Sequence, residues 1–384
     1  MDFKFSDDQI ALRDTVQAVM ARVATPEYVR RLDKEQAYPY ELYDAWVDVG
    51  LLGVPFPEEY GGWGGSVIDT VIVAEELAKT SYDLFGAYNG SVFCGLGLLK
   101  NGSKEQKAYW IPRILSGQTR MTVSMSEPSA GSDVGAMRTK AQLDGDRWRI
   151  NGQKLWSSGA GARHNVINLY ARSRPDGDHR QGISLFLIDA DAPGVTLRKI
   201  DMLGRRSVGT YEIFFDDVSV DESRLVGGAH RGWDCMLSCL QYERITGVAA
   251  YVGGAQAVVD LAASHARERR QFGRPIGSFQ AVAHMIADMQ TEVEAARALM
   301  WRAAWMVSTG ANALKEISMA KLFASETYIK AANLGMQVMG AYGYSMEYDM
   351  QRYFRDARGA TIAGGTSQIQ RNLIARLMGL KAES

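Results

Sequence analysis

The chain has 384 residues, a net charge of −1 and a hydrophobic share of 46%. A chain of this length and apolar content buries a large core and is expected to form two or three structural units. The near-neutral charge gives no support for a nucleic-acid partner. The three cysteines, Cys94, Cys235 and Cys239, are too few for a disulfide framework and are expected to be reduced thiols.

The first residues, MDFKFSDD, are polar and acidic, so we expect no signal peptide. No stretch approaches the roughly 18 uninterrupted apolar residues of a membrane-spanning helix. With the reduced thiols, these features predict a cytoplasmic protein.

Residues 1–120 are expected to form a helical domain. Ser6, with Gln9 three positions later, is typical of a helix N-cap. Residues 41–49 and 71–79 have the apolar spacing of helices. Between them, residues 55–65 are dense in Gly and Pro, which predicts a loop.

Residues 121–226 are expected to form a β domain. Short β-rich runs bounded by turn residues lie at 148–156, 165–170, 183–188, 195–200 and 212–218. In the first run, Asn151 and Gly152 predict a hairpin turn. No segment of helical length separates the runs, as parallel α/β units would require, so we expect an antiparallel barrel or sandwich.

Residues 227–384 return to long helical segments, at 232–270, 280–309 and 314–340. These segments predict a helical bundle. The chain is therefore predicted to be an α+β multidomain protein with an N-terminal helical domain, a central antiparallel β domain and a C-terminal helical domain.

Two segments of the β domain could face a cofactor. Residues 125–134 (MSEPSAGSDV) cluster small residues and hydroxyls, which can bring backbone N–H groups against a polar ring or a pyrophosphate. An ordinary surface turn has the same composition. In residues 154–159 (KLWSSG), a Trp followed by two Ser could cover an aromatic cofactor, and a core Trp before a turn is the alternative.

Two segments of the C-terminal region have side chains suited to phosphate. Residues 267–280 join several Arg to a Gly/Pro turn, and guanidinium groups suit a diphosphate. A solvated helix end, stabilised by the helix dipole, is the alternative. Gly364, Gly365 and Thr366 resemble a helix start, whose amides can hold a phosphate or a ring oxygen. A plain helix cap is the simpler interpretation there.

Glu243 is the candidate catalytic residue. Between Cys235 and Val259, only Glu243 and Arg244 are charged, and helical geometry places Glu243 on an apolar face. Such a carboxylate is either paired with an Arg or is a base whose pKa is raised by burial.

Other chemistry has no support in the sequence. There is no Gly-x-Ser-x-Gly elbow of a hydrolase and no Gly-x-Gly-x-x-Gly of a Rossmann site. Cys235 and Cys239 have no His or further Cys nearby, so we interpret them as small apolar side chains rather than as metal ligands.

Seven segments, in the same order, resemble those of the acyl-CoA dehydrogenase family along essentially the whole chain. They are PEEYGG (57–62), SEPSAGSD (126–133), NGQKLW (151–156), RRQFGRPI (269–276), QVMGAYG (337–343), RDA (355–357) and GTSQIQR (365–371). The resemblance implies the family fold, with a C-terminal four-helix domain. It also implies FAD, held between the β domain and the C-terminal helices, with part of the site supplied by a second subunit.

The resemblance also implies roles for single residues. Met125 and Ser126 would border the flavin, Trp156 and Ser158 would cover it, and Ser132 would lie near the diphosphate or the substrate. The residues implied to reach the FAD of a neighbouring subunit are Arg269, Gln271, Phe272, Gln280, Gln337 and Ala341. The residues implied to contact the adenosine part are Thr366 and Gln368. The family often has a glycine at the position of Ala341, which would allow a closer backbone approach.

The chain departs from most of the family at Gly364, where many members have a catalytic Glu. A minority, the isovaleryl-CoA dehydrogenase type among them, have the base on a helix of the C-terminal domain, at the position of Glu243. The apolar-face argument and the resemblance thus both point to Glu243 as the general base. The predicted substrate-binding residues are Ser132, Arg244, Gly364 and Gly365.

We therefore predict α,β-dehydrogenation of an acyl-CoA, in which Glu243 removes the α proton and the β hydrogen leaves as hydride to the flavin. The alternatives are a carrier-protein-bound acyl group, an enoyl-CoA reductase, an oxidase that uses oxygen, or a flavin or acyl-CoA binding protein without catalysis. The resemblance also implies a homotetramer and an electron-transferring flavoprotein as partner. We expect no metal, nucleic-acid or membrane partner.

Overall fold

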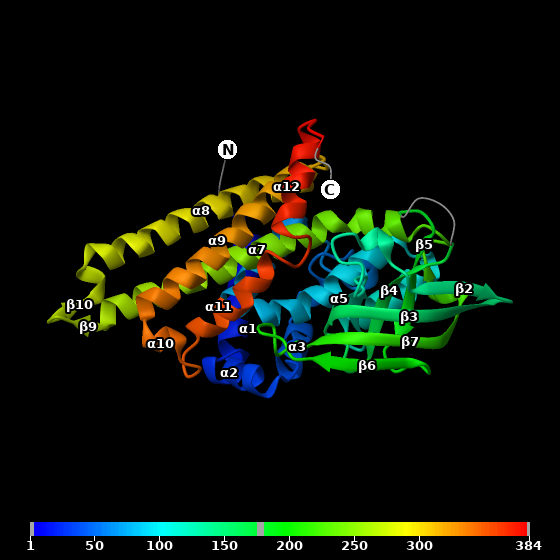
Figure 1. Ribbon diagram of the computed structural model, residues 1–384, viewed down its shortest axis with the longest axis horizontal. Helices are drawn as coiled ribbons and strands as arrows, with labels where there is room; N and C mark the ends of the chain where they lie inside the picture. The colour runs from blue at the N-terminus through cyan, green and yellow to red at the C-terminus, as the bar shows by residue number, and fades with distance from the viewer. Residues whose placement is uncertain (1–3, 175–179, 382–384) are drawn as a thin grey trace.

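The computed structural model describes residues 4–174 and 180–381. Figure 1 shows an elongated molecule, with a β-sheet at one end and three long helices that reach to the other end. The N-terminal helices pack beside the long helices near the middle of the molecule. Helices, a sheet region and helices thus follow one another along the chain, as the sequence predicts.

The N-terminal region is helical. Its elements are α1 (Asp7–Val23), α2 (Pro26–Glu35), α3 (Tyr40–Asp48), η1 (Leu51–Gly53), η2 (Glu58–Tyr60), α4 (Val67–Thr80), α5 (Tyr82–Asn101) and α6 (Lys104–Leu115). The predicted N-cap is confirmed, because the Ser6 hydroxyl accepts from the Gln9 amide and the Gln9 side chain accepts from the Ser6 amide. This reciprocal pairing satisfies two helix donors that would otherwise lack partners.

The middle region forms one eight-stranded sheet in the order β6-β7-β3-β2-β4-β5-β8, with β1 paired to β4. The elements are β1 (Arg120–Ser124), η3 (Val134–Ala136), β2 (Lys140–Asp144), β3 (Arg147–Ser158), β4 (Asn165–Arg172), β5 (Ile183–Asp189), β6 (Val195–Ile200), β7 (Thr210–Asp221), η4 (Glu222–Arg224) and β8 (Leu225–Val226). Most pairings are antiparallel, as predicted, but β4 pairs in parallel with both β1 and β2. The sheet is therefore mixed.

The hairpin turn predicted at Asn151 and Gly152 is wrong. Both residues lie inside the continuous strand β3, where the register against β7 shifts at a bulge. A Cβ on Gly152 would lie 2.7 Å from Thr139, so the glycine is needed for a close approach of two strands. The turn between β2 and β3 comes earlier, where Gly145 has a φ of +63°.

The C-terminal region is helical, as predicted. Its elements are α7 (Gly232–Glu268), β9 (Arg270–Gln271), β10 (Arg274–Pro275), η5 (Ile276–Ser278), α8 (Gln280–Ser308), α9 (Leu314–Met339), α10 (Ala341–Tyr344), α11 (Met350–Ala360) and α12 (Ser367–Leu377). The three long helices pack on one another, and α11 and α12 pack on α9. A small hairpin, β9–β10, closes the far end of α7.

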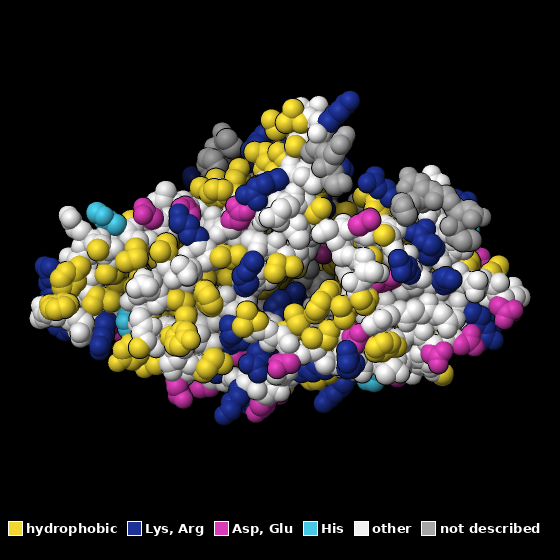
Figure 2. Space-filling view, viewed as in Figure 1, with side chains coloured by type: hydrophobic (Ala, Val, Ile, Leu, Met, Phe, Trp, Pro, Cys, Tyr) yellow, Lys and Arg dark blue, Asp and Glu magenta, His cyan; other side chains and the backbone are white. Residues whose placement is uncertain are grey.

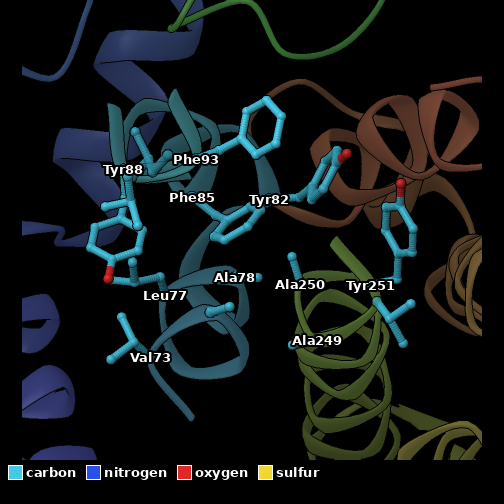
Figure 3. Packing of buried hydrophobic residues seen from close by; sticks show 14 of the residues in the cluster. Val73, Leu77, Ala78, Tyr82, Phe85, Tyr88, Phe93, Ala249, Ala250 and Tyr251 are labelled. Carbon is cyan, nitrogen blue, oxygen red and sulfur yellow. The ribbon is translucent and has the colours of Figure 1, made fainter. Parts of the chain in front are cut away.

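Helix α7 is the central element of the core. It packs against α4 and α5 of the N-terminal region and against α8 and α9. Figure 3 shows Ala249 and Ala250 on the side of α7 that is turned toward Ala78 of α4, while Tyr251 lies on the other side, its ring 5.4 Å from that of Tyr82 of α5. One window of α7 has a mean hydropathy of 1.3, enough for a membrane span by composition, but 72% of it is buried inside the protein. Core packing therefore accounts for its apolar character.

Candidate active site

The segment after β1 is fastened to the strand β3. The Lys154 ammonium donates to the Met125 carbonyl at 2.8 Å, and the Leu155 amide donates to the Ser126 carbonyl at 2.9 Å. These two bonds bring Met125 and Ser126 beside the end of β3. The structure thus joins the two β-domain segments that the sequence marked separately.

A buried ion pair supports this junction. Lys154 is fully buried, and its ammonium lies 2.9 Å from the Glu127 carboxylate, which also accepts from the Arg138 and Thr139 amides. Burial lowers the pKa of Lys154 to about 8, although Glu127 opposes this shift. Burial alone would raise the pKa of Glu127, but Lys154 and the backbone amides outweigh it and lower that pKa. Both residues lie in motifs of the sequence, but no role was predicted for either.

Trp156 lies at a strained and exposed position. Its φ is +67°, which is rare for a bulky residue, and it falls where the β3–β7 register shifts between Lys154 and Ser157. The indole is 53% exposed. A bulge that turns a large aromatic ring outward is typical of a binding surface, so the core interpretation of this Trp is wrong. Ser158 follows, half-buried, with its hydroxyl 3.4 Å from that of Thr210.

Ser132 lies in the exposed turn that follows Ala130. Glu127 and Ala130 exchange two backbone hydrogen bonds, at 3.0 and 3.1 Å, and so close the start of this turn. Ser132 is therefore on the surface, on the segment that also contains Met125 and Ser126.

Gly364 and Gly365 lie in the loop between α11 and α12. Both have positive φ, +64° and +90°, and nothing lies within 4 Å of a Cβ placed on Gly364. The predicted helix start is confirmed, because the Thr366 hydroxyl accepts from the Ile369 amide at 3.2 Å and caps α12. Gln368 is exposed in the first turn of α12.

Two side chains that the sequence did not single out hold this loop. The Lys321 ammonium donates to the carbonyls of Ala360 (3.0 Å) and Gly365 (2.7 Å). The Gln370 amide group donates to the carbonyls of Gly364 (3.3 Å) and Gly365 (3.2 Å). A signal for Lys321 was present, since it is the only charged residue between Glu316 and Glu326 of α9.

Glu243 is half-buried on α7. Its carboxylate forms no hydrogen bond or ion pair with any described residue. Burial raises the pKa of Glu243, and the nearby Arg244 and Lys321 offset this only in part. Cys94, Cys239 and Tyr170 are buried close enough to Glu243 that its charge acts on them. The simple pairing with Arg244, one interpretation of the sequence, is therefore absent from the described part of the chain.

The remaining predicted residues lie at the far end of the long helices. Arg269 ends α7, its guanidinium 5.2 Å from the ring of Tyr342, next to Ala341. Phe272, at the tip of β9–β10, is 93% exposed with a φ of +51°. The predicted residues that are exposed at this end of the molecule are Gln271, Phe272, Gln280, Gln337 and Ala341. About 37 Å of helix separate Glu243 from this end, so the structure does not bring the two groups together within one chain.

FAD fits the surfaces described above. An exposed indole beside serine hydroxyls suits a planar ring with polar edges, and the open loop at Gly364 leaves space in front of the cap of α12. No group of His, Cys, Asp and Glu that could hold a metal ion occurs among the residues the structure describes.

Three family models match consecutive parts of the chain. Those described as the acyl-CoA dehydrogenase N-terminal, middle and C-terminal domains match residues 6–118, 122–218 and 230–379. A probable acyl-CoA dehydrogenase of Bacillus subtilis strain 168, YngJ, is 36% identical and covers 98% of this chain and 99% of its own. The CarC subunit of the caffeyl-CoA reductase–Etf complex of Acetobacterium woodii is 33% identical, with 97% and 99% covered.

Solved structures agree with these matches. The glutaryl-CoA dehydrogenase complex with glutaryl-CoA has a TM-score of 0.94 and 34% identity, covering 99% of this chain and 98% of its own. The prolyl acyl carrier protein oxidase AnaB has a TM-score of 0.91 and 29% identity, with 98% and 100% covered. The FAD complex of PigA has a TM-score of 0.93 and 28% identity, with 100% of both chains covered. The chain belongs to the acyl-CoA dehydrogenase family and is a flavin-dependent oxidoreductase whose cofactor is FAD.

Proposed function

We propose that the protein dehydrogenates an acyl thioester between its α and β carbons, with Glu243 as the general base. The observation that carries this proposal is the state of Glu243: a half-buried carboxylate without a hydrogen-bond partner among the described residues, with a raised pKa. Such a group holds a proton more tightly than an exposed carboxylate does, which suits proton abstraction near neutral pH. Gly364, with no side chain, cannot compete for this role.

In the proposed reaction, each group of residues has a separate role. The Glu243 carboxylate takes the α proton and becomes a neutral acid. The backbone amides at Gly364 and Gly365 donate to the thioester oxygen and so make the α proton more acidic. Bound FAD supplies the two-electron acceptor for the β hydrogen and its electron pair. Trp156 and Ser158 would cover the ring, Met125 and Ser126 would border it, and Cys94, Cys239 and Tyr170 exclude water around the base.

The remaining predicted contacts belong to this proposal. Ser132 and Arg244 would contact the substrate, and Thr366 and Gln368 would contact the adenosine part of FAD. The residues proposed to reach the FAD of a neighbouring subunit in a homo-oligomer, a tetramer by the family resemblance, are Arg269, Gln271, Phe272, Gln280, Gln337 and Ala341. An electron-transferring flavoprotein is the proposed acceptor, and the similarity to CarC of the caffeyl-CoA reductase–Etf complex supports it.

The first experiment defines the thioester. Purified holoenzyme is mixed anaerobically with saturated acyl thioesters of different chains, each linked either to CoA or to a carrier protein, and bleaching of the flavin is recorded. A CoA thioester that bleaches the flavin supports the proposal. If only carrier-linked thioesters react, the substrate is an acyl group on a carrier protein, as the name of AnaB states for that protein. Bleaching by no thioester would contradict dehydrogenation.

The second experiment tests the base. Glu243→Gln keeps the size of the side chain and removes its charge, so we expect FAD to remain bound and the rate of bleaching to fall by roughly 10²-fold or more. Asp260→Asn is the matched control, because Asp260 is an exposed carboxylate on the same helix. Near-normal bleaching by the Glu243 variant would overturn the assignment.

A further inference from the structure

In the loop between α11 and α12, carbonyls accept hydrogen bonds, whereas the amides of Gly364, Gly365 and Thr366 have no described acceptor. The carbonyls of Ala360, Gly364 and Gly365 accept from side chains. The amides of Ile362 and Ala363 donate to the Gly359 carbonyl. In contrast, the amides of Gly364 and Gly365 donate to no described residue. A short turn with its carbonyls fixed and its amides free has the polarity of an anion- or oxygen-binding site.

Lys321 is the principal anchor of this loop. It is only 2% exposed on α9, and its ammonium bridges the first and last carbonyls of the loop. It forms no ion pair among the described residues. A buried cation needs hydrogen-bond partners, and the two carbonyls of the loop are the partners that Lys321 has.

Lys321 also lies close to the proposed base. Burial, helped by Arg244, lowers the pKa of Lys321 to about 8, while Glu326 and Glu243 oppose this shift. The charge of Lys321 in turn acts on Glu243. The cation thus binds the loop and is close enough to the carboxylate of α7 for their charges to interact.

We propose that Lys321 is a positioning residue that clamps the Ala360–Gly365 loop through its carbonyls, so that the amides of Gly364 and Gly365 are held toward the thioester oxygen. This rests on the proposed function. Gln370 is the second anchor, with bonds to Gly364 and Gly365. Because position 364 has no side chain and a positive φ, its backbone has unusual freedom, and the clamp removes that freedom.

The test replaces Lys321 by Met, which keeps the length of the side chain and removes its donors. Lys330→Met, at an exposed position on the same helix, is the matched control. We expect Lys321→Met to bind FAD and thioester nearly normally but to bleach roughly 10- to 100-fold more slowly, the effect of a misplaced group. We also expect faster amide hydrogen exchange in residues 361–366 of the purified protein.

A spectroscopic readout separates positioning from a structural role. The probe is a 3-thia analogue of the best thioester from the panel, which cannot lose hydrogen at the β position. Its carbonyl stretching band should shift to lower frequency on binding to the wild type and should shift less on binding to Lys321→Met. An equal shift and an equal bleaching rate in both proteins would overturn the proposal.

Two controls keep the test decisive. If Lys321→Met does not fold, Gln370→Met replaces it, and a smaller change of the carbonyl band in the same direction is expected; an unchanged band overturns the proposal. The Glu243→Gln variant distinguishes the proposed base from the proposed clamp. Loss of bleaching in Glu243→Gln with normal behaviour of Lys321→Met refutes only the clamp, whereas normal bleaching in Glu243→Gln refutes the proposed base.

Discussion

At the scale of single residues, Glu243 is expected to cost stability where it is charged. Its pKa is raised in the folded protein, so the free energy of unfolding falls as pH rises from the ordinary Glu pKa through the raised one. Glu243→Gln should therefore raise Tm at pH 8. The gain should shrink toward zero at a pH near or below about 4, where the carboxyl is neutral in both states.

Thermal unfolding of the two FAD-loaded proteins across pH measures this difference. Asp260→Asn, at an exposed position of the same helix, provides the baseline. A lower Tm of Glu243→Gln at pH 8 would mean that the charge is stabilised by a partner in the folded state. That result would favour the structural interpretation of Glu243 over the catalytic one.

The sequence predicted single residues well where local chemistry decides their conformation. The Ser6 and Thr366 caps depend on neighbours within three positions, so they could be recognised. Trp156 is a residue whose conformation could not be predicted from its neighbours in the sequence. Its left-handed backbone arises from a register shift between β3 and β7, strands more than 50 residues apart, and no local pattern contains that information. Lys321 was missed for the same reason, since its partners, the carbonyls of Ala360 and Gly365, are distant in sequence. The contacts of Gln370 are local, but the sequence pattern did not mark them.

At the scale of elements, two glycines of α7 differ in whether close packing requires them. A Cβ on Gly253 would lie 2.2 Å from the Glu75 carbonyl, so α7 and α4 touch through backbone there. A Cβ on Gly247 would have its nearest neighbour, the Tyr251 hydroxyl, at 4.0 Å. Both glycines are in the same helix, but only the first is required by its surroundings.

We therefore expect opposite effects from the same substitution. Gly253→Ala should lower the free energy of unfolding by about 1–3 kcal/mol through overpacking, while Gly247→Ala should raise it by about 0.5–1 kcal/mol through reduced backbone entropy. Chemical denaturation of both variants measures this contrast. A destabilisation of equal size at both positions would contradict the close approach of α4 and α7.

The order of helices and strands was predictable because the apolar spacing that marks each element is a local pattern. The pairing of the strands was not predictable. The sequence places strands at β4 to β7 and helices at α7 to α9 within a few residues. It could not show that β4 takes parallel neighbours, since pairing joins distant segments. The Asn151–Gly152 pair misled because a bulge and a turn both favour glycine.

At the scale of the whole molecule, the RDA segment joins all three regions. Arg355 of α11 pairs with Asp33 of α2 at 2.6 Å and donates to the Leu203 carbonyl of the middle region at 3.1 Å. The adjacent Asp356 accepts from the Arg205 amide at 2.7 Å.

Figure 2 shows exposed apolar side chains over much of the long-helix face. This surface extends to the far end of α7, where Phe272 is exposed.

The separation of the two groups of predicted FAD residues leads to a test of the shared site. If FAD lies between subunits, the far end of one chain completes the site that contains Glu243 of another. Two defective variants should then complement each other: Glu243→Gln, and the double variant R269A/Q271A. A hybrid dimer pairs the intact Glu243 of one chain with the intact far end of the other, and random mixing gives about a quarter of wild-type sites. Co-expression followed by the bleaching assay measures this recovery, with each variant alone as the baseline. Absence of recovery in verified hybrids would show that the far end serves its own chain or none.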